Sequence, residues 1–372
     1  MTDTTLLVTV DSLRYDYYQY MTVTREFLGD SHPATFATNT ATPSCFQSII
    51  GGIYPGEVGV DADSNVAVEL DSPYKYGIST NRFLSGRYGY NLGFDHFTAP
   101  SRHDKGLKDK VAEHMTPQST LFGVASRVWN AVQGIQRRVS AVDREYRTAA
   151  DVISEFIDAT DDREEWFGWL HFMEPHHPYN PNDGPVSRGE AQQITRRVLN
   201  GRASDHDAEI ARQLYRGEVE ELDYRLERLW DAIPDDTRIL FVADHGELLG
   251  EYGEWGHHAT MCPELLRLPL ASRNIPIESD VVSLIDIPTL LLDREYNHGS
   301  FQRETAFAAS NGNHAAMNRN HVATDDGVVT LDGDSAEDEE LMAARAEFED
   351  RADRPVTKDE LPEDDLEALG YL

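Results

Sequence analysis

The sequence predicts an α/β fold built on a mostly parallel β-sheet. Three segments have the apolar, β-branched or aromatic composition of buried parallel strands: TTLLVTVDSLR at 4–14, EEWFGWLHFMEPHHPY at 164–179 and TRILFVADHGE at 237–247. Amphipathic stretches with apolar residues at three- and four-residue spacing lie between them, at 149–159 and 214–233. Strands that alternate with helices in this way form parallel sheets with helices on their faces.

Reactive side chains follow the predicted strands. The first strand segment ends in Asp11, and the third ends in Asp244 and His245. The remaining strand segment ends in His176 and His177, in a loop bounded by prolines that restrict its direction. Ligands of open α/β sheets bind beyond the carboxyl ends of the strands, so we expect these five residues to gather at one edge of the sheet.

The charge of the chain is extreme, because 66 acidic residues against 33 basic ones give a formal net charge of -33. Self-repulsion of this size destabilises a compact fold in dilute buffer, and molar salt screens it because the Debye length falls to about 3 Å. The composition therefore indicates a protein of a salt-rich cytoplasm such as that of haloarchaea, with an acidic mesophilic protein as the alternative. It also argues against nucleic acid as a partner.

The two cysteines, Cys45 and Cys262, are too few for a disulfide framework and indicate a reducing compartment. The N-terminus lacks the basic start and apolar run of a signal peptide, and no stretch approaches about 18 uninterrupted apolar residues, so we expect no membrane span and a cytoplasmic location. The strand and helix pattern weakens after about residue 300. We therefore expect a main domain over 1–300 and a small, acidic, partly helical subdomain over 301–372 that packs on it.

Asp11, Asp244 and His245 offer two carboxylates and an imidazole, which together suit a divalent cation. An Asp after a strand is more often a turn or helix-cap residue, but the run Asp-His-Gly-Glu after a strand is more specific, since Gly246 allows close approach of the backbone. His257 follows a glycine in a turn-rich segment and offers a further cationic contact.

Five segments follow one another in an order found in a known family: LLVTVDSLRYD at 6–16, TATPSCFQSIIGGIYPGEVGV at 40–60, YGISTNRFLSGRYGYNLGFDHF at 76–97, HFMEPHHPYNP at 171–181 and LFVADHGELLGEYGEWGHH at 240–258. The chain resembles the sulfatases of the alkaline phosphatase superfamily, and ELLRLPL, VVSLIDIPTLL and the closing LEALGYL match further landmarks of that family. The resemblance implies a three-layer α/β/α sandwich around the parallel sheet, with a sulfatase-like catalytic domain as the main domain.

The resemblance also identifies a nucleophile position. Counted back from the Gly-Ile-Tyr-Pro anchor at 52–55, Thr42 falls where sulfatases carry the cysteine that matures to formylglycine. Threonine cannot give that aldehyde, and Phe46 stands where the family has an arginine. The resemblance therefore implies Thr42 itself as the nucleophile, as in the phospho-transfer branches of the superfamily. The helix that we expect to begin at about Pro43 points its N-terminal amides at the same place, and Cys45 is expected to face the core.

The metal site of the family corresponds to Asp11, Thr42, Asp244 and His245, so we expect these residues to hold one divalent ion. A bound metal would lower the pKa of the Thr42 hydroxyl and hold its oxygen in line with an incoming anion. Many sulfatases have a second acid after the first, where this chain has Ser12. The lost carboxylate weakens a calcium site and the imidazole suits zinc or manganese, so Mn, Zn and Ca are the candidates. The resemblance allows a second ion without naming its ligands.

The remaining site residues are also taken from the resemblance. It implies His176 and His257 as catalytic residues that protonate the leaving alkoxide. It implies Asn81 and His177 as substrate-binding residues. Arg14, just past the first metal strand, is expected either to bind the substrate anion or to pair with a nearby acid.

Two functions of different classes stay open. One is a metal-dependent hydrolase or transferase of a small or glycan-linked anionic ester: Thr42 and His245 favour phosphate, and the sulfatase-like pattern leaves open a sulfuric ester hydrolase that acts without formylglycine. The other is a pseudoenzyme that binds anionic glycans or a partner protein, which Phe46 and Ser12 support. We assign substrate specificity to loops such as 101–137, and the sequence defines no oligomeric state.

Overall fold

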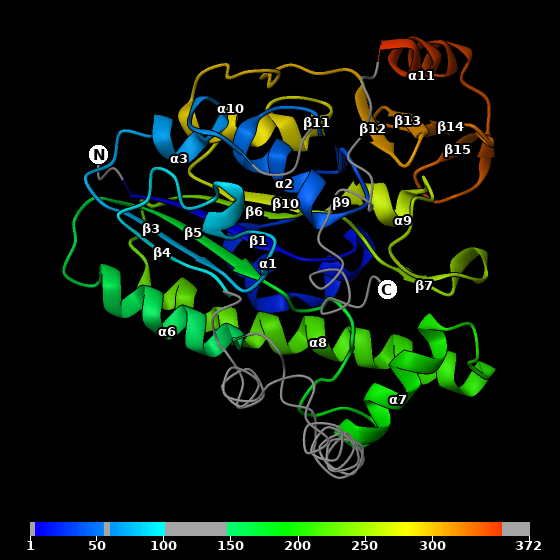
Figure 1. Cartoon of the computed structure of the whole chain (residues 1–372), viewed down its shortest axis with the longest axis horizontal. Helices are drawn as coiled ribbons and strands as arrows, with labels where there is room; N and C mark the ends of the chain where they lie inside the picture. Colours follow the sequence, from blue (N-terminus) through cyan, green and yellow to red (C-terminus); the bar gives the residue numbers. More distant parts are fainter. Residues whose placement is uncertain (1–3, 56–59, 101–146, 352–372) are drawn as a thin grey trace, which may run out of the picture.

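The structure is a computed structural model that describes residues 4–55, 60–100 and 147–351. The expected specificity loop over 101–137 and the closing LEALGYL motif lie outside the described residues. A six-stranded sheet forms the centre of the molecule (Figure 1), and its strands in spatial order are β10 (Leu270–Arg273), β6 (Arg238–Ala243), β1 (Thr4–Val10), β5 (Trp166–Phe172), β3 (Lys75–Ser79) and β4 (His96–Thr98). All pairings are parallel except that of β10 with β6, so the predicted mostly parallel sheet is confirmed.

Helices cover both faces of this sheet (Figure 1). Below it as drawn lie α6 (Ala149–Thr160) and the long α8 (Asp205–Ala232), with α7 (Arg188–Leu199) and α1 (Thr22–Leu28) packed against α8. Above it lie α2 (Thr42–Gly51), α3 (Val66–Glu69) and α10 (Ile287–Leu292). Because both faces are covered, every residue of β1 and β5 is buried, which explains their nearly continuous apolar sequences.

The helices on the lower face begin at capping residues. Thr148, Ser187 and Ser204 precede α6, α7 and α8, and each side chain accepts a hydrogen bond from a backbone N–H three residues further on. This bond satisfies one of the amides that a helix leaves without an internal partner at its start. The helices predicted over 149–159 and 214–233 are confirmed, and the second begins earlier than expected because of the cap at Ser204.

The register of the central strands fixes where the polar strand ends lie. Val10 pairs with Ala243 on one side and with Phe172 on the other. The next residues, Asp11 and Asp244, therefore emerge side by side at the carboxyl edge of the sheet. Backbone hydrogen bonds hold them there, because the Asp11 N–H donates to the carbonyl of Phe172 (2.9 Å) and the Asp244 N–H donates to that of Val10 (3.3 Å).

Helix α2 brings Thr42 to the same edge. Ala41 is the N-cap and Pro43 occupies the first turn, where its missing N–H has no cost. The helix ends at Gly52, whose positive φ of 63° suits a glycine at a helix terminus. All ten residues of α2 are buried, and Phe46 packs edge-on against Tyr90 and His171 and is tilted against Trp169. The predicted helix start is confirmed.

The described residues after 300 form strands as well as a helix, and the strands were not predicted. These residues contain a five-stranded antiparallel sheet followed by one helix: β12 (Ala306–Ser310), β13 (Asn313–Met317), β14 (His321–Thr324), β15 (Gly327–Thr330), β16 (Ser335–Ala336) and α11 (Glu339–Arg351). Strand β12 packs against the residues that precede α2. The Ala309 N–H donates to the carbonyl of Thr38 (3.0 Å), and the Thr40 hydroxyl donates to the Ser310 hydroxyl (3.1 Å). These strands are short and rich in alanine, which is why the sequence pattern did not reveal them.

Further short elements are β2 (Thr35–Phe36), β7 (Leu248–Leu249), β8 (Trp255–Gly256), α9 (Pro263–Leu266), β9 (Arg267–Leu268) and β11 (Val282–Ser283). Strands β7 and β8 pair as a two-stranded hairpin, and β2 lies between β11 and β9. None of the helices in the described part of the chain is long and apolar enough to span a membrane.

The packing of Phe46 gives a test of the fold. Replacement Phe46→Ala removes a fully buried ring that touches three aromatic neighbours, so we expect a loss of about 3–5 kcal/mol in the free energy of unfolding. Denaturant unfolding in molar KCl measures it. The control is Tyr224→Ala on α8, where the side chain is 64% exposed and the expected change is within about 0.5 kcal/mol. Equal changes in the two variants would contradict this packing.

Candidate functional site

Two acids and a histidine meet at the carboxyl edge of the sheet. One ligand atom from each of Asp11, Asp244 and His245 lies within 4.8 Å of the other two, and all three residues are fully buried. The Thr42 hydroxyl completes the group, because its oxygen lies 3.3 Å from Asp11 Oδ2 and 3.1 Å from His245 Nε2. The structure thus brings together the four residues that the sequence analysis predicted as metal ligands. We refer to them as the acidic cluster.

Local hydrogen bonds hold the two carboxylates in place. Asp244 Oδ1 accepts from the backbone N–H groups of Ser12 (3.1 Å) and His245 (2.8 Å). Ser12 reaches this position with a positive φ of 58°, a conformation that is strained for serine. Asp11 accepts from the Ser12 hydroxyl at Oδ1 (2.9 Å) and from the Asn81 side-chain amide at Oδ2 (3.1 Å). Asn81, predicted to bind substrate, therefore lies against Asp11.

His245 presents a lone pair to the acidic cluster. Its Nδ1 lies 2.9 Å from the carbonyl oxygen of Gly246, which can only accept, so Nδ1 carries the hydrogen. In the neutral ring Nε2 is then unprotonated, and it lies 3.9 Å from Asp11 Oδ1 and 3.6 Å from Asp244 Oδ2. This is the tautomer that a metal-binding histidine needs.

The electrostatics of the acidic cluster favour a bound cation. Burial, and then the negative charge of Asp11, raise the pKa of Asp244 to about 6. Burial alone would lower the pKa of His245, but Asp244 and Asp11 outweigh it and raise that pKa. Two adjacent carboxylates in one buried space repel each other, and a divalent ion would remove this repulsion. Asp244 Oδ2 supports this interpretation, since it is buried and has no hydrogen-bond partner among the described residues. The oxygen and nitrogen donors present therefore fit a divalent metal.

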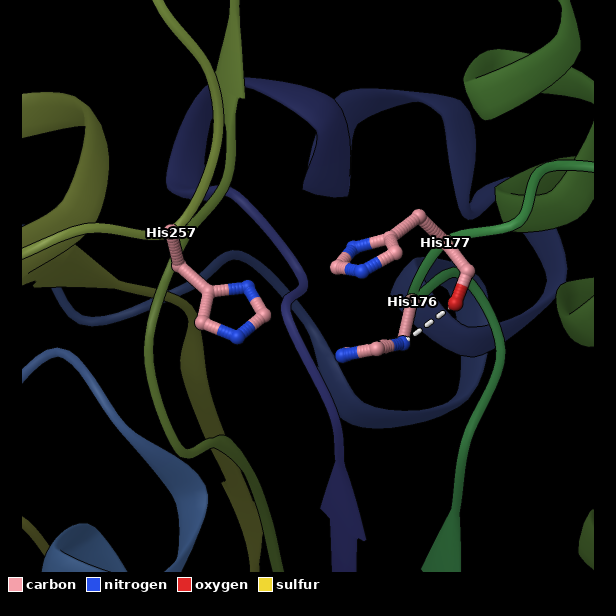
Figure 2. A group of neighbouring side chains, drawn as sticks. All are labelled: His176, His177 and His257. Atoms are coloured by element: carbon pink, nitrogen blue, oxygen red, sulfur yellow. Dashed lines mark hydrogen bonds between the residues drawn. The ribbon is translucent and has the colours of Figure 1, made fainter. Parts of the chain in front are cut away.

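Three further histidines lie close to one another (Figure 2). His176 and His177 come from the loop after β5, and His257 directly follows β8. One ring nitrogen from each lies within 4.8 Å of the other two, and all three residues are buried. The ring centroids of His245 and His257 are 4.5 Å apart, so the two groups adjoin. We refer to these three residues as the histidine cluster.

Glu247 connects two members of the histidine cluster. Its Oε1 lies 3.3 Å from Nδ1 of His177, its Oε2 lies 3.0 Å from Nδ1 of His257, and the Tyr179 hydroxyl also donates to Oε1. Burial would raise the pKa of Glu247, but the two histidines hold it well below its usual value.

Burial keeps His176 and His257 neutral. Burial, reinforced by the neighbouring His177, lowers the pKa of His176 to about 4. Burial and the nearby His245 lower the pKa of His257 to about 3. Both rings are therefore neutral near pH 7, which is not the protonated form that a general acid requires.

Arg14 is paired with acidic side chains. Its Nε and Nη2 bond to the two carboxylate oxygens of Asp16 (2.8 Å each), and its Nη1 bonds to Glu251 Oε1 (2.7 Å). Of the two alternatives predicted for this residue, the structure has the pairing with nearby acids. The guanidinium also donates to the backbone carbonyl of Glu247 (3.2 Å), so it supports the segment that carries the acidic cluster.

Two residues of the site were missed by the sequence analysis. His171, within β5, has its Nε2 3.7 Å from Asp11 Oδ2, and its Nδ1 lies 3.1 Å from the Thr9 hydroxyl. Glu247 lies in the predicted metal motif, two residues after His245. Its position close to the end of a predicted strand was the sequence signal that could have identified it as a site residue. His171 gave no such signal, since a single histidine within an apolar strand is more often structural.

The alternative nucleophiles near Thr42 are less suitable. Cys45 is buried in α2, and its Sγ donates to the backbone carbonyl of Asn39 (3.1 Å). Burial raises the pKa of this thiol well above its usual value, which disfavours the thiolate. The core position predicted for Cys45 is confirmed.

The profile of the Sulfatase family matches residues 69–293, more than half of the chain. The chain belongs to the sulfatase family. Among curated proteins it is similar to the low-salt glycan biosynthesis sulfotransferase Agl7 of Haloferax volcanii, with 36% identity over 148 residues that cover 35% of this chain and 34% of that protein. The match thus spans about a third of the length of this curated relative.

Solved structures share the fold of this sulfatase-family chain. The phosphonate monoester hydrolase SpPMH from Silicibacter pomeroyi superposes with a TM-score of 0.60 at 15% identity, covering 94% of both chains. A protein of the alkaline phosphatase superfamily from Vibrio parahaemolyticus superposes with a TM-score of 0.56 at 14% identity, covering 95% of this chain and 87% of that one. The predicted fold class, an alkaline-phosphatase-like α/β sandwich, is confirmed.

The acidic cluster gives a test that needs no substrate. Asp244→Asn keeps an oxygen for the two backbone N–H donors and removes one of two buried negative charges. We expect the variant without metal to melt at the same temperature as the wild type or higher, because the repulsion is relieved. We also expect it to lose stabilisation by Mn²⁺ or Zn²⁺, which for the wild type at 100 times the Kd is about 2.7 kcal/mol.

Thermal melts with and without the ion, after treatment with a chelator, measure both effects. Asp235→Asn is the control, since that side chain is exposed beside Arg273. An Asp244→Asn variant that is stabilised by metal as strongly as the wild type would contradict the acidic cluster as a metal site.

Proposed function

We propose that the protein is a metal-dependent hydrolase of an anionic ester, with Thr42 as the nucleophile. The observation that carries the proposal is the position of the Thr42 oxygen, 3.3 Å from Asp11 Oδ2 and 3.1 Å from His245 Nε2. A threonine that only packs within a helix would not be expected to place its hydroxyl within hydrogen-bond distance of two buried potential metal ligands. At this position it can lose its proton and attack.

The chain supplies the nucleophile, its orientation and part of the anion site. Thr42 opens the ten-residue helix α2, whose first N–H groups point toward the approaching ester and favour its negative charge. The Thr42 hydroxyl gives its proton to its acceptor Asp11 Oδ2, and its oxygen forms a bond to the phosphorus or sulfur atom while the bond to the leaving oxygen breaks. Water then attacks the same atom and releases the Thr42 oxygen, which regains a proton as the water molecule loses one. A divalent ion held by Asp11, Asp244 and His245 would lower the pKa of the hydroxyl and neutralise charge on the transferred group.

The leaving oxygen departs toward the histidine cluster in this proposal. His176 and His257 lie next to His245, with ring centroids 5.1 Å apart from each other and 4.5 Å from His257 to His245. In this proposal one of these two rings takes a proton from water during the reaction and passes it to that oxygen, and His177 contacts the substrate from the same side. Asn81 orients Asp11 rather than the substrate, since its amide is used by that carboxylate.

For the substrate we favour a phosphate or sulfate ester carried on a glycan. Threonine at the nucleophile position favours phosphate, because formylglycine cannot form there. The family favours sulfate, and a haloarchaeal relative bears the name of a sulfotransferase of glycan biosynthesis. Transfer to a sugar hydroxyl instead of water is the second candidate function that this relative suggests, and it uses the same Thr42 intermediate.

A pseudoenzyme that only binds glycans is the weaker alternative. Phe46 and Ser12 replace residues that the family uses, yet the acidic cluster is complete around Thr42. A degraded site would have no selective reason to keep a buried pair of carboxylates, because their repulsion destabilises the fold.

The nucleophile is tested by replacing Thr42. We expect Thr42→Ala to lower turnover of p-nitrophenyl phosphate, bis-p-nitrophenyl phosphate or p-nitrophenyl sulfate by at least about 10³-fold, and Thr42→Ser to retain part of it. The assay is run in molar KCl with Mn²⁺, Zn²⁺ or Ca²⁺. Ser44→Ala is the matched control, since this buried hydroxyl lies two residues along the same helix.

Two outcomes decide against the proposal. Full activity in Thr42→Ala would mean that another group attacks the ester. No turnover of any of the three esters with any of the three metals by the wild type would favour the binding-only alternative.

A further inference from the structure

The hairpin of β7 and β8 connects two residues of the candidate site. Glu247 directly precedes β7, and His257 directly follows β8. Leu248 pairs with Gly256 in this hairpin, so its base lies at the site and its turn, residues 250–254, lies further out. The hairpin projects from the body beside α9, on the right of Figure 1. The side chains of this turn are therefore placed to contact the outer part of a substrate.

Tyr252 in this turn has a backbone conformation that a tyrosine rarely adopts. Its φ of 57° and ψ of 12° lie in the left-handed region. Of the five other non-glycine residues with positive φ in the described part of the chain, four are asparagine or aspartate, which tolerate that region, and the fifth is Ser12 within the site. Glycine at position 252 would avoid the strain. Strain of this kind is concentrated at functional sites, so the tyrosine side chain needs an explanation.

The ring of Tyr252 is fixed in solvent and is not part of the core. The residue is 61% exposed, and its hydroxyl donates to Glu264 Oε2 at 3.3 Å. Glu264 belongs to α9, and the carbonyl of Leu265 in the same helix accepts the N–H of Gly246 at 2.9 Å. Gly246 directly follows His245. The tyrosine therefore bonds to a helix that itself contacts the segment of the acidic cluster.

Neighbouring elements hold the turn in place. The Arg212 guanidinium of α8 donates to the carbonyl of Leu249 at 2.9 Å and lies over the ring of Trp255, 5.5 Å from its centroid. Glu251 accepts from the Arg14 guanidinium at 2.7 Å and from the Leu249 N–H at 2.6 Å. A binding surface that is held in this way loses little conformational freedom when a ligand binds.

Two carboxylates lie beside Tyr252 in this region. Glu254 Oε2 accepts from the Thr260 hydroxyl at 3.0 Å, and Glu264 accepts from the tyrosine. Neither glutamate forms an ion pair with a residue that the structure describes, so both keep lone pairs for further donors. His257 lies three residues from both Glu254 and Thr260, and three residues of chain span at most about 11 Å. The carboxylates are thus close to the site and open to hydroxyl groups.

We propose that Tyr252, Glu254 and Glu264 form a subsite for a neutral sugar unit that carries the ester, an inference that rests on the proposed function for the position of the ester group. The exposed ring offers a flat apolar face to the C–H groups of a sugar, and the two carboxylates accept hydrogen bonds from its hydroxyl groups. The same two negative charges repel further anionic groups. The subsite therefore selects a glycan with a single sulfate or phosphate ester over a polyanionic chain.

Binding measured without turnover tests the subsite. Calorimetric titrations use the full chain with Thr42→Ala in molar KCl and Mn²⁺. The probes are the 6-phosphates and 6-sulfates of glucose, mannose and galactose, and inorganic phosphate and sulfate probe the anion position alone. We expect the added variant Tyr252→Gly to weaken binding of at least one sugar ester by about 5–10-fold and to leave binding of the inorganic ions unchanged. Tyr224→Ala is the control, since that tyrosine is equally exposed on α8, and it should change neither.

Two further variants separate binding from a structural role. Glycine relieves the left-handed strain, so Tyr252→Gly should melt at about the wild-type temperature. Tyr252→Phe keeps the ring and loses only the bond to Glu264, so we expect it to retain affinity for the sugar ester within about 3-fold. A lower melting temperature in Tyr252→Gly with unchanged sugar binding would assign the tyrosine to stability and overturn the subsite.

The carboxylates are tested by the double variant Glu254→Gln/Glu264→Gln. Glutamine keeps the side-chain length and removes both negative charges. We expect the ratio of affinities for a sugar disulfate and its monosulfate to rise by about 5-fold, because the repulsion of the second sulfate is lost. A ratio that stays the same in titrations of the same Thr42→Ala chain would contradict selection by these two charges.

Failure of the subsite is distinct from failure of the proposed function. The proposed function fails when the wild type turns over none of the nitrophenyl esters, and the titrations are still readable in that case. Sugar esters that bind no more tightly than the inorganic ions would overturn the subsite while the chemistry of Thr42 stands. Equal losses for sugar esters and inorganic ions in Tyr252→Gly would also overturn it.

Discussion

The burial of carboxylates at the carboxyl edge of the sheet is the constraint on which the rest of the site depends. Asp11, Asp244 and Glu247 are fully buried, and removing an ionised carboxylate from water costs several kcal/mol unless other groups compensate. The chain compensates with N–H donors: two backbone amides at Asp244, an amide side chain at Asp11 and two imidazoles at Glu247. This network explains why a serine adopts positive φ beside the first acid, because its N–H must reach the second.

Residues next to strand ends could be predicted from the sequence because local patterns determine them. Asp11 and Asp244 follow apolar strands that the hydrophobic pattern reveals, whereas Thr42 was predicted from the resemblance to sulfatases. Residues whose role comes from contacts across the sheet could not be predicted in this way. His171 reaches Asp11 across 160 residues of sequence, and only the pairing of β1 with β5 brings the two together.

The two changes from the sulfatase pattern have related physical consequences. The arginine position of the family is occupied by Phe46, whose ring packs against Trp169 and His171 and carries no charge. The second-acid position is occupied by Ser12, whose hydroxyl donates to Asp11. One substitution removes a positive charge and the other removes a negative charge, so the net charge of the site changes little while its polarity falls. In the proposed function, a bound cation rather than an arginine would therefore attract the anion.

Strand β12 connects the five-stranded antiparallel sheet to the segment that precedes Thr42. Ala309 and Ser310 bond to the segment Thr38–Thr40, directly before the helix that carries Thr42, and the Asn313 amide bonds to the carbonyl of Ala259, two residues past His257. These contacts cannot form until the ribosome has made more than three hundred residues. The segment before Thr42 and the loop after His257 are therefore secured late in synthesis, so a nascent chain would lack a finished site while most of its sheet is already present.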